Sequence, residues 1–245
     1  MRRQNFSIPM QLTLVFALLL LGCTATAIGS SSHAHEVLPI RNFLNVGQGQ
    51  RDGVITVRNT RNHTLPVEMV VFRRIVSEDG VQTLERADDE FLVFPPQFVV
   101  PQGGSQAVRF QYLGDPDIAQ SIAYVIEAQE VPVVPEGFSG ITTVYNVGAA
   151  LYVQPARPRA QLEISNVRRE GSSVHFEVRN TGNDYSFLTL NQMQLRFADG
   201  VFDLEPEAVN EIIANPIVPP NSLRRFEMDV SAYPDGVPEI RFGRF

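Results

Sequence analysis

Hydrophobic and polar residues alternate along most of the chain, which is the pattern of half-buried β-strands. From position 54 to position 59, for example, Val, Thr and Arg alternate with Ile, Val and Asn. The alternation predicts a first series of strands at 37–46, 51–59, 66–75, 90–94, 105–112, 121–131 and 140–153. A series of this number and length, separated by Gly-, Asn- and Asp-rich turns, is typical of an immunoglobulin-like sandwich.

Pro155-Ala-Arg-Pro158 interrupts the alternation and predicts a stiff, extended linker at 155–159. Beyond it, a second series of strands is predicted at 161–167, 173–180, 188–197 and 224–230, with a late strand near Ile240 and one helical turn within 204–214. We therefore expect an all-β fold with an N-terminal domain at 35–154 and a C-terminal β-sandwich domain at 160–245.

The N-terminus has the features of a secretory signal peptide. Arg2 and Arg3 precede the apolar run 12–21, and small residues follow up to Ala27. The pattern predicts cleavage after Ala27, or as late as Ala34, and therefore export to the bacterial periplasm. The apolar run is too short to span a bilayer comfortably, so no integral membrane span is expected in the mature protein.

Cys23 is the single cysteine of the chain, and it follows Leu20-Leu21-Gly22. This resembles a lipobox, in which the cysteine becomes lipidated after cleavage. The alternative is a small residue near the end of the apolar run. Under either interpretation no disulfide can form within one mature chain, so the apolar core must hold the fold.

The composition argues against several classes of protein. The formal net charge is −7, and no basic run interleaved with aromatics occurs, so a nucleic-acid partner is not expected. No G-x-S-x-G or H-E-x-x-H motif is present, and the four histidines are scattered, so neither catalytic residues, a metal site nor a cofactor is predicted. All 20 basic residues are arginines, so any bound carboxylate must pair with a guanidinium.

The segment 140–155, GITTVYNVGAALYVQP, predicts a long strand that leads directly into the linker. Ile141, Thr143, Tyr145 and Val147 lie on its more apolar face. Such a strand can be an ordinary core strand. If it lies at a sheet edge, its backbone can also pair with another chain, which is the basis of β-augmentation.

Several segments resemble the periplasmic pilus (fimbrial) assembly chaperones of the chaperone–usher pathway. The matching segments are Ile40-Arg41 with 53–59, the Pro-rich step and Gly turn within 91–109, 150–155, and 162–180 with Gly182-Asn183. The resemblance implies two immunoglobulin-like β-sandwiches in an L-shape, without enzymatic activity. It also implies binding of pilin subunits by donor-strand complementation, with 141, 143, 145 and 147 as donor positions, and delivery to an outer-membrane usher.

Members of this family hold the subunit's C-terminal carboxylate between an arginine of the first strand and a lysine of the last strand of domain 1. Arg41 matches the first position. The second falls near Ala150, and the absence of lysine indicates a divergent or archaic branch. Arg109 is the leading candidate for the second cation, and Arg157 and Arg159 at the linker are the alternatives. The alternative to a chaperone is a structural or adhesive surface protein of two sandwiches, lipid-anchored through Cys23.

Overall fold

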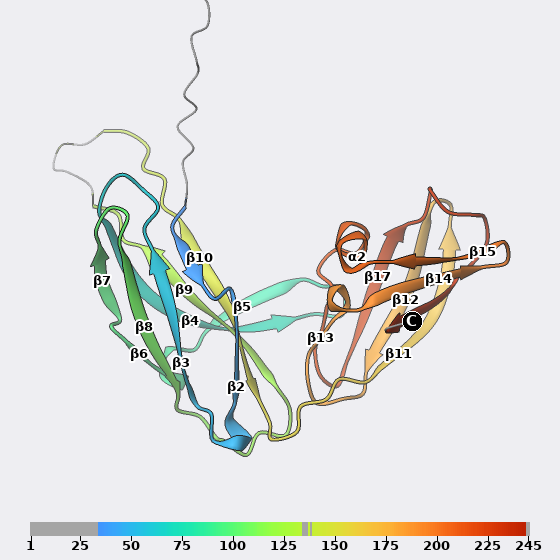
Figure 1. Cartoon of the computed structure of the whole chain (residues 1–245), viewed down its shortest axis with the longest axis horizontal. Coiled ribbons are helices and arrows are strands. Elements are labelled where there is room, and N and C mark those ends of the chain that lie inside the picture. The colour runs from blue at the N-terminus through green and yellow to red at the C-terminus, as the bar shows by residue number, and fades with distance from the viewer. Residues whose placement is uncertain (1–33, 134–136, 138, 244–245) are drawn as a thin grey trace, which may run out of the picture. The chain divides into compact units, whose positions relative to one another are not determined.

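The computed structural model describes residues 34–133, 137 and 139–243, so the predicted signal peptide and Cys23 lie outside the described residues. Within these residues the chain forms two β-sandwiches, as the alternation predicted, and a single α-helix, α2 (Figure 1). Among the same residues no helix is both long and apolar enough to cross a membrane.

The first sandwich consists of two sheets. One has the order β1-β3-β8-β6, and the other has the order β2-β10-β9-β4-β5, with β7 also paired to β4. The bounds of the first sheet are β1 Glu36–Leu38, β3 Asp52–Arg58, β8 Ser105–Tyr112 and β6 Phe91–Phe94. Those of the second are β2 Arg41–Asn45, β10 Asn146–Gln154, β9 Ile122–Glu130, β4 Leu65–Val76, β5 Gln82–Arg86 and β7 Gln97–Val100. Two 3-10 turns, Val46–Gln48 and Asp88–Glu90, connect strands of this sandwich.

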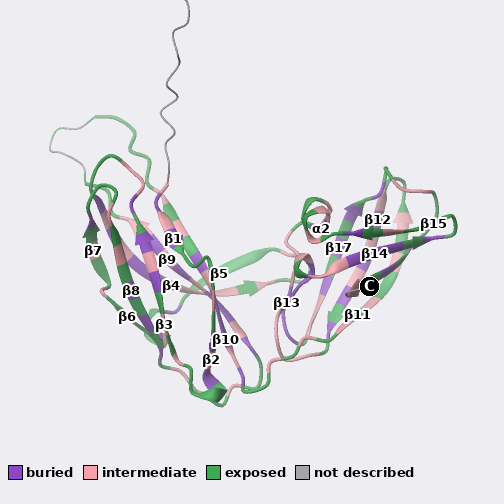
Figure 2. Cartoon of the chain, in the orientation of Figure 1, coloured by how far each residue is buried: buried purple, intermediate pink, exposed green. Residues whose placement is uncertain are grey.

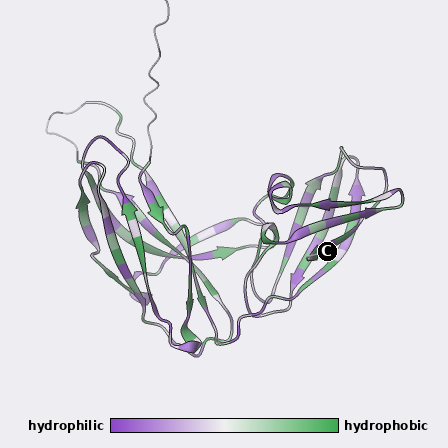
Figure 3. Cartoon of the chain, in the orientation of Figure 1, coloured by the Kyte–Doolittle hydropathy of each residue, from purple (hydrophilic) through white to green (hydrophobic). Residues whose placement is uncertain are grey.

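The core of the first sandwich is built from every second residue of these strands (Figures 2 and 3). In β3 and β8, for example, Ile55 and Val108 are fully buried while the residues beside them reach the surface. Burial of one apolar side chain of this size contributes about 1.5–3 kcal/mol, so alternation over many strands suffices to specify the sandwich.

The second sandwich has its own apolar core, centred on Phe176, Leu195 and Phe226. Its sheets have the orders β11-β12-β17, β13-β16 and β15-β14-β18. The bounds are β11 Leu162–Glu170, β12 Ser173–Asn180, β13 Ser186–Phe187, β14 Gln192–Phe197, β15 Gly200–Leu204, α2 Pro206–Ile212, β16 Ile217–Val218, β17 Ser222–Asp229 and β18 Glu239–Gly243, with a 3-10 turn at Leu188–Leu190.

Polar contacts connect the two sandwiches. The guanidinium of Arg224 is buried and donates to the backbone carbonyls of Glu78, Asn215 and Ile217. Burial lowers the pKa of Arg224, and the charge of Asp79 offsets this desolvation only in part. Gln154, just before the predicted linker, donates from Nε2 to Asp184 Oδ2 at 2.9 Å.

Four features of the first sandwich differ from the sequence prediction. The predicted strand 37–46 is two strands, because the chain leaves β1 at Pro39, which has no N–H, and enters the other sheet as β2. The predicted strand 140–153 begins only at Asn146. Two strands were not predicted: β5, because all five of its residues are exposed and show no apolar alternation, and β7, which has only four residues and directly follows Pro95-Pro96.

Candidate functional site

The candidate site is centred on β10, whose two edges are covered to different extents. On one side β9 pairs with it from Asn146 to Val153. On the other side β2 pairs in parallel only from Ala150 to Gln154. Within the described residues, no strand covers the second edge of 146–149. Unpaired backbone groups at a strand edge are able to pair with another chain.

The predicted donor positions divide into two groups. Ile141 is 97% exposed, Thr143 is exposed, and both precede β10. Val147, in contrast, packs against the core of the first sandwich, in the same row as the buried Ala149, Leu151 and Val153. Tyr145 lies between the two groups, beside Arg61. Part of the predicted row is therefore accessible, and part serves the chain's own core.

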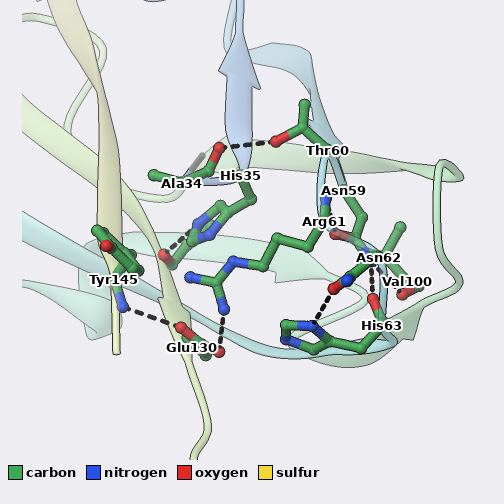
Figure 4. Close-up of polar contacts among 11 residues, drawn as sticks. Ala34, His35, Asn59, Thr60, Arg61, Asn62, His63, Val100, Glu130 and Tyr145 are labelled. Atoms are coloured by element: carbon green, nitrogen blue, oxygen red, sulfur yellow. Dashed lines mark hydrogen bonds and ion pairs between the residues drawn. The ribbon is translucent and has the colours of Figure 1, made fainter. Parts of the chain in front are cut away.

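A polar cluster lies where the chain leaves β9 and returns to β10 (Figure 4). Glu130 Oε1 pairs with Arg61 Nη1 at 2.5 Å, and its Oε2 accepts a hydrogen bond from the Tyr145 N–H at 3.0 Å. The Arg61 guanidinium lies 4.8 Å above the centre of the Tyr145 ring. Only 9% of the Arg61 side chain and 11% of the Glu130 side chain are exposed.

His35 is buried beside this cluster. Its Nε2 donates to the carbonyl of Ala128 at 2.9 Å, and its Nδ1 has no hydrogen-bond partner among the described residues. Burial lowers the pKa of His35 below 6.5, and the nearby charge of Arg61 lowers it further, against the raising effects of the Ala128 bond and Glu130.

A second cluster of cations and aromatic rings lies at the other end of β10, around Tyr152. The Tyr152 hydroxyl bonds to Nη2 of Arg74, on β4, whose guanidinium lies 5.3 Å from the centre of the ring. The Tyr152 ring packs against Phe187 at 5.2 Å, and Arg41 lies 4.4 Å from the centre of the Phe187 ring. Arg41 and Arg74 therefore lie around one aromatic pair.

Neither arginine of this cluster forms an ion pair with a carboxylate of the described residues. Burial raises the pKa of Tyr152, while the charges of Arg74 and Arg41 oppose the increase. Arg74 and Tyr185 also line a hollow of about 410 Å³. The arrangement provides two guanidinium groups in a partly apolar setting, which suits a carboxylate.

The structure does not bring the two arginines predicted from the sequence together. Arg41 begins β2, where it pairs in register with Ala150 of β10, as the predicted anchor positions require. Arg109 lies on β8 in the other sheet, 74% exposed and 3.8 Å from Asp52. The sequence does not single out Arg74 as an anchor, because its neighbour Tyr152 is 78 residues away in the chain.

Among the described residues, no group of three or more His, Cys, Asp or Glu side chains could hold a metal ion. The polar clusters of the site consist of arginine, glutamate, tyrosine and histidine, and they suit recognition of a chain end or a strand.

No protein-family model matches the chain, and no curated protein matches it. Solved structures do match. The YadV chaperone superposes with a TM-score of 0.55 at 13% identity, covering 86% of this chain and 92% of its own. The E. coli chaperone DraB superposes with a TM-score of 0.53 at 18% identity, covering 85% and 88%.

A third match is a chain of the CsuC-CsuE chaperone-tip adhesion subunit pre-assembly complex, from the archaic chaperone-usher Csu pili of Acinetobacter baumannii. It superposes with a TM-score of 0.53 at 14% identity, covering 86% of this chain and 99% of its own. At these identities the comparison shows the fold. The resemblance to the pilus chaperones noted in the sequence is confirmed as a shared two-sandwich architecture.

Proposed function

We propose that this chain is a non-enzymatic periplasmic chaperone that binds pilus subunits by donor-strand complementation and delivers them to an outer-membrane usher. The N-terminal domain, 35–154, carries the donor strand, and the linker 155–159 connects it to the second domain. The observation that carries the proposal is the edge of β10 at 146–149, which no strand of the described residues covers, preceded by the exposed Ile141 and Thr143.

The backbone of β10 supplies the ladder bonds in this mechanism, and the preceding side chains supply specificity. A subunit that lacks one strand of its sandwich has an open apolar groove and two unpaired strand edges. The segment ending at β10 lies along that groove, with Ile141 and Thr143 directed into it. Tyr145 and Val147 belong to the base of the donor strand, because they are held by the chaperone itself.

We assign the carboxylate anchor to Arg41 together with Arg74. Both lie around the Tyr152–Phe187 pair, and Arg41 is the registered partner of Ala150. Each guanidinium can present two parallel N–H donors to the subunit's C-terminal carboxylate. Arg109 remains a second candidate only for a client that reaches the opposite sheet. The partly apolar setting strengthens an ion pair relative to one in open water.

Ile141→Asp tests the donor segment. The variant should lose co-purification of co-expressed pilus subunits, because a carboxylate cannot be buried in an apolar groove without a partner. Leu190→Asp is the matched control, since Leu190 is an exposed apolar residue of the second sandwich. Unchanged subunit recovery with Ile141→Asp would contradict the donor-strand assignment.

Single alanine variants of three arginines test the anchor. Arg41→Ala and Arg74→Ala should each weaken subunit binding by about tenfold or more, the loss expected when one partner of a charge-assisted pair is removed. Arg109→Ala should bind as the unaltered chain does. Titration with a subunit whose C-terminal carboxylate is amidated provides the reciprocal check, because its affinity should no longer depend on Arg41 or Arg74.

A further inference from the structure

Glu130 and Tyr145 form the last rung between the two strands, at the residue where β9 ends and immediately before β10 begins. The Glu130 N–H donates to the carbonyl of Tyr145 at 3.2 Å. The Tyr145 N–H donates in turn to the carboxylate of Glu130. The side chain thus takes the place that a backbone carbonyl holds in a regular antiparallel rung.

Arg61 completes this rung from the turn that connects β3 of one sheet to β4 of the other. It contacts both members of the rung, through the ion pair with Glu130 and the face of the Tyr145 ring (Figure 4). Removing two charges from water costs several kcal/mol per ion, and a well-packed apolar pair of the same size is often as stable. Stability alone therefore does not explain why this position is charged.

The apolar pattern of β10 does not by itself determine the register in which β10 pairs with β9, and a charged contact can determine it. A one-residue slip would expose the core row and is excluded by burial. A two-residue slip would place Tyr145 where Val147 lies, and Thr143 where Tyr145 lies, so an apolar or neutral row would still face the core. On the edge away from β9, nothing among the described residues pairs with 146–149 to prevent it.

We propose that Arg61, Glu130 and Tyr145 form a register clamp that determines where β10 begins. This rests on the proposed function, since the start of β10 decides which side chains reach the client's groove. A two-residue slip would break the Arg61–Glu130–Tyr145 contacts and displace Ile141 by two positions along that groove. The three residues are positioning residues, because they act through the segment that they hold.

Paired cysteines measure the register without any client. Asn146 and Gln129 are registered partners, and they form a non-hydrogen-bonded pair because the adjacent rung at 130 and 145 is hydrogen-bonded. Such a pair has the short Cα separation that a disulfide needs. In a full chain carrying Cys23→Ser, Asn146→Cys with Gln129→Cys should therefore cross-link. Asn146→Cys with Glu127→Cys, the partner after a slip of two, should not.

The clamp is removed with Arg61→Leu and Glu130→Leu together, which replaces the buried ion pair by apolar side chains and leaves no uncompensated charge. Cooperative thermal unfolding checks that this double variant folds. Its cross-linking should shift from the 129–146 pair toward the 127–146 pair by at least about twofold. An unchanged cross-linking ratio in the folded double variant would overturn the proposal. If it does not fold, Glu130→Gln, which retains the shape and removes the charge, takes its place.

The second measurement is capture of the pilus subunit that co-purifies with the unaltered chain. The double variant should capture it about tenfold less well, because a mispositioned strand loses its side-chain fit. Glu127→Gln, on the same strand, is the matched control and should capture normally. Normal capture by a double variant whose register has shifted would also overturn the role in positioning. If the unaltered chain captures no subunit, the proposed function fails, while the cross-linking ratio still decides the clamp.

Discussion

The sequence Val-Arg-Asn-Thr-x-Asn occurs in both sandwiches, at 57–62 and at 178–183, and one asparagine in each copy organises the turn. Asn59 and Asn180 are fully buried, and the Nδ2 of each lies within hydrogen-bond distance of three backbone carbonyls. The Oδ1 of each accepts from the backbone N–H two residues later. The framework of the turn is therefore the same in both halves of the molecule.

The two copies differ in the residue that follows Asn-Thr. In the first sandwich it is Arg61, which reaches the rung at the base of the donor segment. In the second it is Gly182, where an added Cβ would lie 2.1 Å from the backbone oxygen of Arg159 in the linker. One framework thus supports a charged contact in one sandwich and a close backbone approach in the other. The shared asparagine therefore stabilises the same turn in both sandwiches, while the residue two positions later makes a contact that is specific to each sandwich.

The largest effect should come from removing the shared asparagine. Asn59→Ala and Asn180→Ala each leave buried carbonyls without a donor and should lower the free energy of unfolding by about 2–4 kcal/mol. Urea unfolding followed by hydrogen exchange in each sandwich measures this loss and assigns it. A loss below about 1 kcal/mol in either copy would show that the two turns are not equivalent.

A smaller loss is expected at the position where the copies differ. Gly182→Ala should lower the free energy of unfolding by about 1–3 kcal/mol, because its Cβ meets backbone rather than a flexible side chain. Hydrogen exchange of the Asn183 N–H, which donates to Arg159 O at 2.8 Å, should accelerate. Gly200→Ala is the control, because its Cβ would make only ordinary contacts with Phe202.

The cluster around Arg61 should also make the first sandwich sensitive to acid. The folded state lowers the pKa of His35 below 6.5, chiefly through burial, so near pH 6.5 the unfolded chain takes up a proton that the folded chain does not. The free energy of unfolding, as far as it depends on His35, is therefore highest well above pH 6.5 and decreases as the pH falls through 6.5. His35→Gln should remove that part of the pH dependence in urea unfolding at a series of pH values. His63→Gln, at an exposed histidine, should retain it.

The smallest effect is expected at exposed ion pairs, where the two sandwiches should behave alike. Arg109 lies 3.8 Å from Asp52 in the first sandwich, and Arg196 lies 3.8 Å from Glu239 in the second. Arg109→Ala and Arg196→Ala should each change the free energy of unfolding by about 0.5 kcal/mol or less, because solvent screens both pairs. Thermal unfolding at low and high salt measures it. A much larger loss for Arg109→Ala would point to a structural role on its sheet.

Alternation predicted most strands of both sandwiches to within a few residues, and it predicted β8 and β12 with the bounds that the structure has, but it missed the short strands β5, β7, β13, β15 and β16. The prediction failed where the apolar pattern of the side chains and the pairing of the backbone do not coincide. Residues 140–145 continue the apolar row of β10 without belonging to the strand, and β5 is a strand without an apolar face. The alternation of apolar and polar residues indicates which side chains are buried, whereas strand pairing also depends on which strand edges lie side by side.

The sequence by itself determined the two-sandwich fold. Alternation with a period of two can be recognised in each short segment, because it follows directly from the burial of one face of a strand. It also determined that any carboxylate must meet an arginine. Only the tertiary structure decided which arginines are available. Arg61 meets Glu130 across 69 residues and Arg74 meets Tyr152 across 78, because sheet order and register bring them together. Among the residues that the structure describes, the same long-range pairing leaves one edge of β10 uncovered at 146–149, where we propose that a client binds.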